Sequence, residues 1–172
     1  MIVNAATLWV WVPGDKALDL PLLRQTLKGL PGVRVAISSA DCGIEGFRRA
    51  HLDALTTQHV LGRLHAPAPV VHFDMVRLVA LMSQDAEATQ QFVAHTLGDL
   101  ALAPQALRRA LLTFLSSGCN ATEAADLLHT HRNTLLRRLA RAQELLPRPL
   151  AHNRIHVAAA LEALNWTAQE PR

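Results

Sequence analysis

One stretch in the second half of this 172-residue chain decides its fold: Ser117-Gly118-Cys119-Asn120-Ala121-Thr122-Glu123-Ala124-Ala125-Asp126-Leu127-Leu128-His129-Thr130-His131-Arg132-Asn133-Thr134-Leu135-Leu136-Arg137-Arg138-Leu139. Asn120 can cap a helix through its side-chain oxygen, and Glu123 three residues later completes a reciprocal cap. The helix predicted over 121–128 is barely two turns long, and its alanine pair leaves room for a neighbour. A second helix is predicted over 132–146. Two helices joined by so short a turn must cross steeply, which is helix-turn-helix geometry.

The second helix has one apolar and one polar face. Leu135, Leu139, Ala142 and Leu146 fall within about 60° of one another on a helix that turns roughly 100° per residue, so we expect this stripe to be buried. Asn133, Arg137 and Arg141 fall on the opposite face. In the major groove of DNA, arginine pairs bidentately with guanine and asparagine with adenine. The pattern therefore predicts a DNA-reading helix.

Other side chains of this helix suit the DNA backbone. Arg132 and Arg138 flank the outward face, where they can hold phosphates, and His131 and Thr134 lie at the helix start. The predicted DNA-binding set is His131, Arg132, Asn133, Thr134, Arg137, Arg138 and Arg141.

Charge is distributed unevenly along the chain. Residues 1–104 hold eight Lys or Arg against nine acids, whereas residues 105–172 hold nine arginines against five acids, a net +4. The whole-chain charge is only +3. A basic second half beside a neutral first half indicates an acidic partner, with nucleic acid the first candidate.

The two halves also differ in their predicted elements. Short apolar runs predict strands at 8–12, 33–38 and 70–73, with helices at 21–30 and 47–64 and a flexible connection at 43–46. Such β-α-β-α-β alternation is typical of helices packed on a sheet. Helices follow at 75–82 and 87–97, then at 105–116, 121–128, 132–146 and about 153–166. The predicted class is mainly α or α+β, with a boundary between residues 98 and 106.

Several classes of protein are disfavoured. The chain has no apolar run of about 18 residues and no basic N-terminal leader, so we expect a soluble, cytoplasmic protein without membrane contact. Cys42 and Cys119 lack metal-ligand spacing and are expected to be buried thiols. His152 and His156 stand four residues apart without an accompanying carboxylate motif, so surface histidines are favoured over a metal site. No cofactor is predicted.

Residues 107–166 closely resemble the C-terminal helix-turn-helix of the PucR/CdaR family of bacterial transcriptional regulators. The residues that carry the resemblance are Leu128-His129-Thr130-His131-Arg132-Asn133-Thr134-Leu135, Arg138-Leu139 and Glu144-Leu145-Leu146. The stretch Gly43-Ile44-Glu45-Gly46-Phe47-Arg48-Arg49-Ala50-His51-Leu52-Asp53-Ala54 is similar to the degenerate GGDEF-like domain that precedes those helices in the family. The resemblance implies a partial GGDEF-like α/β domain over 1–100 and the helix-turn-helix domain over 105–168.

The chain departs from the family in two motif positions and in length. Thr130 stands where a larger aliphatic residue is common, and Leu136-Arg137 where Arg-Tyr is frequent, which implies a different base preference. Family members are usually much longer and begin with a sensing region. We therefore expect either a small orphan regulator or a truncated one, in which effector sensing is missing.

The sequence bears on three functions other than that of a DNA-binding regulator. A nucleotide cyclase needs a Gly-Gly-Asp/Glu-Glu-Phe turn for metal and phosphates, which the sequence lacks, so we do not expect an enzyme. RNA binding by base stacking is disfavoured because the chain has no tyrosine and only seven scattered Trp and Phe. The remaining alternative is a non-catalytic interaction or dimerisation module. As a regulator, the chain is expected to bind double-stranded DNA as a homodimer, because one helix-turn-helix makes few base contacts.

Overall fold

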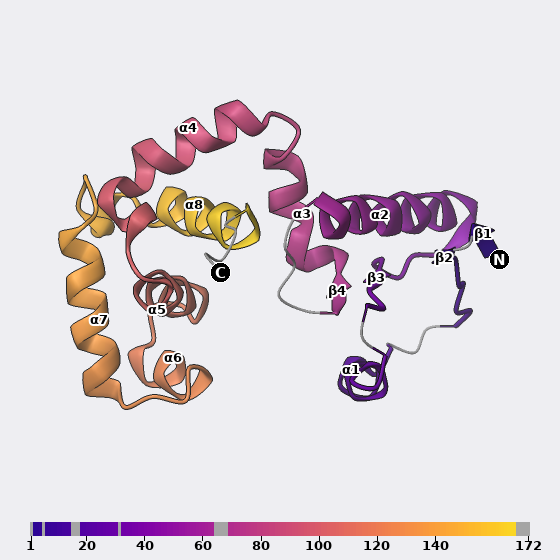
Figure 1. The fold of residues 1–172 in the computed structure, drawn as a ribbon, viewed down its shortest axis with the longest axis horizontal. Coiled ribbons are helices and arrows are strands. Elements are labelled where there is room, and N and C mark those ends of the chain that lie inside the picture. Colours follow the sequence, from indigo (N-terminus) through magenta and orange to yellow (C-terminus); the bar gives the residue numbers. More distant parts are fainter. Residues whose placement is uncertain (1, 5, 15–17, 31, 64–68, 168–172) are drawn as a thin grey trace.

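The computed structural model describes residues 2–4, 6–14, 18–30, 32–63 and 69–167, and most of them are helical (Figure 1). The elements follow one another as β1 (Ile2–Asn4), β2 (Thr7–Leu8), α1 (Leu20–Leu27), β3 (Val35–Ile37), α2 (Gly43–Arg63), β4 (Val70–His72), α3 (Phe73–Met82), α4 (Ala86–Leu97), the 3₁₀ helix η1 (Gly98–Leu102), α5 (Gln105–Ser116), α6 (Ala121–Leu127), α7 (Arg132–Glu144), the 3₁₀ helix η2 (Leu150–His152) and α8 (Arg154–Thr167). The predicted helix end at residue 64 and domain end at residue 168 lie outside the described residues.

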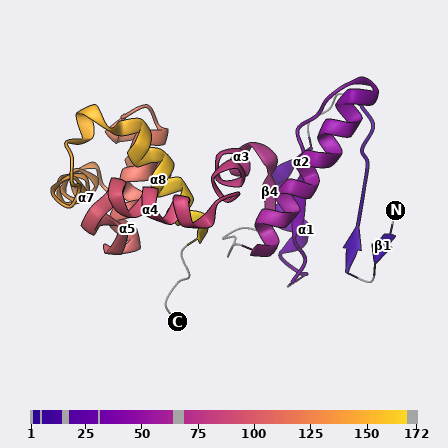
Figure 2. The same cartoon turned by 90° about the horizontal axis from the view of Figure 1, so that it is seen from above.

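Helices α4 to α8 gather at one end of the molecule, the strands and α2 lie at the other, and α3 stands between them (Figures 1 and 2). The four helices predicted between residues 105 and 166 are confirmed, with ends shifted by no more than two residues. They share one core built from Val93, Leu97, Leu100, Ala110, Leu111, Ala124, Ala125, Leu135, Leu139, Ala142, Leu150, Val157, Ala160, Leu161 and Ala163.

This core extends beyond the predicted boundary at 98–106. Val93 and Leu97 of α4 and Leu100 of η1 pack in it, although the boundary leaves all three with the first part of the chain. The turn between α4 and η1 depends on Gly98, whose φ is +52°. A Cβ at Gly98 would stand 3.1 Å from Cδ of Pro147, so this turn packs closely against the segment that follows α7.

The first part of the chain contains one parallel strand pair. β3 and β4 are joined through α2 and pair in register from Val35 opposite Val70 to Ile37 opposite His72. The strands predicted at 33–38 and 70–73 are thus confirmed in shorter form. Leu27 of α1 packs on Ile37 and Val70, and the C-terminal end of α2 packs on α3.

The buried strand predicted at 8–12 is wrong. Only Thr7 and Leu8 are in a strand, paired antiparallel with β1, and Val10 and Val12 are 70% and 58% exposed. Among the described strands, β1 and β2 pair only with each other, so no larger sheet buries the run. Trp11 instead stacks on Phe47 of α2 with ring centroids 5.9 Å apart.

The flexible connection predicted at 43–46 is also wrong, because α2 begins at Gly43. Asp41 organises the helix start: its carboxylate accepts hydrogen bonds from the Cys42 N–H at 2.8 Å and from Nε of Arg49 at 2.9 Å. These two bonds, in that order, lower the pKa of the Asp41 carboxyl. Cys42 is exposed and Cys119 half-buried, so the expectation of two buried thiols is wrong as well.

The turn before α6 is set by a left-handed backbone. Gly118 has φ +63°, and the Cys119 N–H donates to the Phe114 carbonyl at 2.9 Å, which closes α5 with a Schellman motif. Asn120 then caps α6 as predicted, accepting from the N–H groups of Thr122 and Glu123 at 3.1 and 3.3 Å. The reciprocal bond from Glu123 does not form, because the Asn120 N–H donates to the Ser117 carbonyl at 3.0 Å.

The turn between α6 and α7 is a second turn with a left-handed residue, here a histidine. His129 has φ +49°. Its N–H donates to the Asp126 carbonyl at 3.1 Å, and the Thr130 N–H donates to the Ala125 carbonyl at 3.0 Å. These are the two bonds of a Schellman motif, and they fix the angle at which the chain leaves α6.

Replacing Leu135 should destabilise the fold. Its side chain is fully buried in the core, so Leu135→Ala should lower the free energy of unfolding by about 2–5 kcal/mol in chemical denaturation. Ile155, which is 83% exposed on α8, provides the control: Ile155→Ala should change that free energy by no more than about 0.5 kcal/mol. Similar costs for both variants would contradict the orientation of α7.

The stability of variants at His129 should follow how well each new residue tolerates a left-handed backbone. His129→Gly should preserve the free energy of unfolding or raise it by up to about 1 kcal/mol, because glycine adopts positive φ without a steric penalty. His129→Val should lower it by about 1–2 kcal/mol, and His129→Asn should fall between them. Thermal unfolding measures the order, and a valine variant as stable as the glycine variant would show that the turn adopts another conformation.

Candidate nucleic-acid interface

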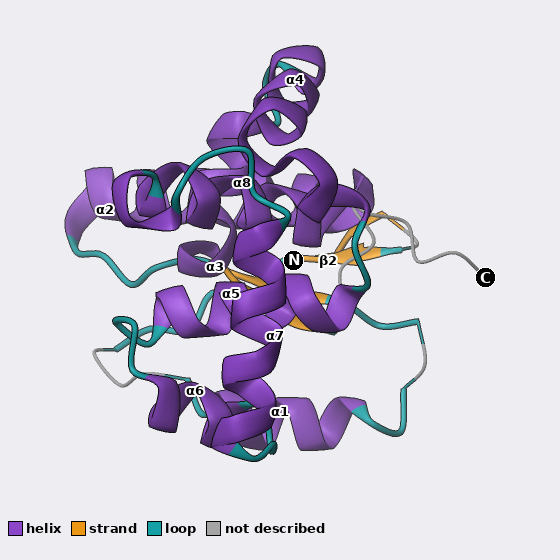
Figure 3. Ribbon diagram, turned by 90° about the vertical axis from the view of Figure 1, so that its left-hand side faces the viewer, coloured by secondary structure: helices purple, strands orange, loops and turns teal. Residues whose placement is uncertain are grey.

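Helix α7 lies at the edge of the helical end, farthest from the first strands (Figures 1 and 2). Seen from that side it crosses the front of the molecule (Figure 3). Leu135, Leu139 and Ala142 are buried against α5 and α6, as the apolar stripe predicts. The helix ends at Glu144, so the fourth predicted member, Leu146, follows the helix and is half-buried.

The opposite face of α7 is open to solvent. Asn133, Arg137 and Arg141 are all exposed, and Ala140 between them is exposed too, so at that position a neighbouring surface can approach the helix backbone closely. The structure thus brings the three predicted base-reading residues to one face. A helix with this face can enter a groove of double-stranded DNA without a rearrangement of the core.

The residues predicted to contact phosphates surround this face. Arg132 is exposed in the first turn of α7, and Arg138 is half-buried on its flank. Arg132, Arg137 and Arg138 form no ion pair with any residue in the part of the chain that the structure describes. Their guanidinium groups are available to an external anion.

The start of α7 is not closed by a side chain. His131 is the N-cap residue, is exposed and makes no capping hydrogen bond, and the first turn carries no acidic residue. The first N–H groups of a helix have no partner within it and carry a partial positive charge. Thr134, half-buried, lies beside them in this first turn. The helix start is therefore suited to an anion such as a phosphate.

Arg141 differs from the other arginines of α7 because it forms an ion pair. Its Nη1 lies 2.8 Å from Oε2 of Glu144, one turn later on the same exposed surface. Helical periodicity predicts Arg141 on the outward face, but its pairing with Glu144 was not predicted. The three-residue spacing of Arg141 and Glu144 is the signal that could have revealed it, since residues three apart are neighbours on a helix.

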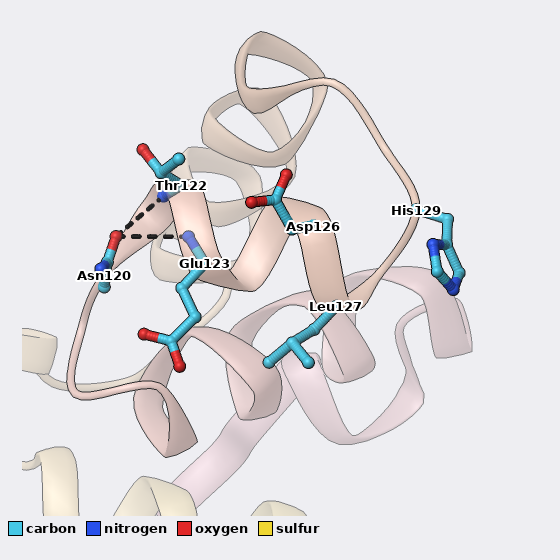
Figure 4. Close-up of a pocket in the computed structure, with 6 residues that line it drawn as sticks. All are labelled: Asn120, Thr122, Glu123, Asp126, Leu127 and His129. Atoms are coloured by element: carbon cyan, nitrogen blue, oxygen red, sulfur yellow. Dashed lines mark hydrogen bonds between the residues drawn. The ribbon is translucent and has the colours of Figure 1, made fainter.

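Helix α6 presents the opposite charge to solvent. Figure 4 shows Glu123 at the capped start of the helix and Asp126 about one turn later. They line an open hollow of about 500 Å³ together with Asn120, Thr122, Leu127 and His129. The basic surface of this helix pair therefore belongs to α7 and not to α6.

The structure also bears on metal sites and on membrane-spanning helices. Within the described ranges, no three or more His, Cys, Asp or Glu side chains are grouped so that they could hold a metal ion. His152 and His156 are both exposed. Among the helices described, none is both long and apolar enough to cross a membrane.

Comparison with known proteins gives one match. Residues 107–163, about a third of the chain, match the family model described as the PucR C-terminal helix-turn-helix domain. Neither the curated proteins nor the solved structures contain a sequence that matches the chain. The matched segment begins within α5, contains α6 and α7, and ends within α8. Residues 107–163 therefore form a PucR C-terminal helix-turn-helix domain.

Proposed function

We propose that this chain is a DNA-binding transcriptional regulator of the PucR type, and that α7 enters the major groove of double-stranded DNA. The observation that carries the proposal is the division of α7 into two faces. Leu135 and Leu139 hold one face in the core, while Asn133 and Arg137 stand exposed on the other with no internal partner among the described residues. PucR-type proteins with this domain are transcription regulators.

Asn133 and Arg137 are the proposed base-reading residues. They are four positions apart, about 6 Å along the helix axis, which corresponds to roughly two base-pair steps of 3.4 Å. Both lie in the first two turns of α7, and the N-terminal part of a recognition helix is the part that contacts base edges. Asn133 suits adenine and Arg137 suits guanine.

Arg132 and Arg138 are proposed to hold phosphates, with His131 and Thr134 at the uncapped start of α7 close to the DNA backbone. These contacts position the helix without reading sequence. Arg141 lies near the opposite end of α7 and is bound to Glu144, so we assign it a backbone contact that competes with this ion pair.

We also propose a domain organisation, an oligomeric state and a cellular location for this regulator. A GGDEF-like part over 1–100 is supported by the parallel unit of β3, α2 and β4, and a helix-turn-helix domain over 105–168 by the family match. Homodimerisation is supported by exposed apolar side chains in the first part, among them Ile44 and Phe47 at 87% and 55% exposure. A regulator of this kind acts in the cytoplasm, where bacterial DNA lies. No effector is assigned.

Loss of Arg137 should reduce sequence discrimination. Selection from random duplex DNA should first yield an enriched site. Arg137→Ala should then bind that site about 5- to 150-fold more weakly, because a good bidentate base contact is worth about 1–3 kcal/mol. Arg132→Ala should weaken binding to all duplexes alike, and the slope of log affinity against log salt should become shallower by about 0.9. Arg24 is an exposed arginine of α1 and serves as the control. Arg24→Ala removes the same charge and should change neither the affinity nor the salt slope appreciably.

Fluorescence anisotropy on labelled duplexes across a salt series measures these effects. If selection enriches no sequence at low salt, and Arg132→Ala leaves both affinity and slope unchanged, the regulator assignment is wrong. The protein-interaction module is then the better interpretation. Half-site spacing in the enriched sequences reports whether two copies bind together.

Removing Glu144 should strengthen DNA binding. Glu144→Gln releases the Arg141 guanidinium and deletes a negative charge on the exposed surface of α7. We expect tighter binding to specific and random duplexes alike, with a salt slope steeper by about 0.9 for the one phosphate gained. In an Arg141→Ala background the same substitution should leave the slope unchanged. Unaltered affinity in the single variant would show that Arg141 does not reach DNA.

A further inference from the structure

A cleft far from the exposed face of α7 opens between α2, α3, α4 and α8, with a volume of about 260 Å³. Its walls come from both parts of the chain. Val60 and Val79 belong to the cluster formed by α2 and α3, whereas Val93 and Ala163 belong to the core of the helical end. A molecule in this cleft would touch both clusters at once.

The polar groups of the cleft divide into two kinds. The hydroxyls of Ser83, Thr89 and Thr167 donate to the carbonyls of Ala80, Met82 and Ala163, so their protons are already used. His59 and Gln90 are exposed, and neither side chain has a hydrogen-bond partner in the described part of the chain. Among the described lining residues, His59 and Gln90 are thus the side chains that keep a free donor, while the three hydroxyl oxygens can still accept a hydrogen bond.

Among the residues that the structure describes, no Asp, Glu, Lys or Arg lines the cleft. A charged ligand would lose its hydration on entering and find no opposite charge to compensate, which is unfavourable. A neutral apolar body would instead displace water that the apolar wall holds poorly, which favours binding. The lining therefore selects against ions and for uncharged molecules.

We propose that this cleft binds a small neutral molecule with an apolar body and one hydrogen-bonding group, directed at His59 or Gln90. A closed apolar cavity of 150 Å³ accommodates benzene, so the cleft fits a single ring with a short polar substituent. This inference goes beyond DNA binding and does not depend on it. Because the ligand contacts both clusters, binding stabilises the packing of α3 and α4 against α8.

The test uses the full chain and a matched pair of probes, benzyl alcohol and benzoate, which share a ring and differ in charge. Isothermal titration and thermal unfolding should show saturable binding of benzyl alcohol with a rise in Tm. Benzoate should bind at least tenfold more weakly. In NMR titrations the amide signals of His59 and Gln90 should shift with the same affinity.

Filling the cleft should abolish this binding. Ala94 is exposed on α4 and lines the cleft, so Ala94→Leu should weaken binding of benzyl alcohol at least tenfold. Ala88→Leu makes the same change on the same helix outside the cleft and should leave it unchanged. If Ala94→Leu does not fold, Ala86→Leu at the other end of the lining replaces it. Absence of saturable binding, equal binding of benzoate, or binding that survives the filled cleft would overturn the proposal.

Discussion

The orientation of α7 depends on the packing of Leu135, Leu139 and Ala142 against α5 and the short helix α6. α6 can approach closely because Ala124 and Ala125, both buried, have almost no side chain at the contact. The left-handed turn at His129 then sets where α7 begins. Since a helix has a fixed angular spacing, burial of one stripe places Asn133 and Arg137 outward. The exposed Asn133 and Arg137 face of α7 is thus a consequence of core packing and turn geometry together.

The sequence predicts the helical end well and the first part poorly, for a physical reason. Long periodic segments with caps and breakers define α5 to α8 closely, because amphipathic periodicity and caps act locally. The run Leu8–Val12 has the composition of a buried strand, but burial requires a partner layer, and no local pattern supplies one. Likewise Gly98 and Pro104 mark a break in the chain, whereas the core continues across it through Val93 and Leu100.

The exposed face of α7 could be predicted for the same reason, since periodicity alone separates Arg137 from Leu135. Interactions between side chains on that face could not be derived from periodicity. Because Arg141 forms an ion pair with Glu144, it is less available to an external partner than Asn133 and Arg137 on the same face. The cleft between α2, α3, α4 and α8 was beyond sequence reasoning altogether, because its walls come from segments more than 100 residues apart, from His59 to Thr167.

Helix α8 has one further consequence, which concerns the cooperativity of unfolding. Val157 and Ala160 are anchored in the core of the helical end, while Trp166, two turns later, is buried with Val60 and Val76 in the other cluster. The single continuous helix α8 therefore contributes side chains to both hydrophobic clusters and connects them. Fraying of its last turn would release Trp166 and leave the packing of α7 intact. The two clusters can therefore separate by local unfolding before either of them unfolds completely.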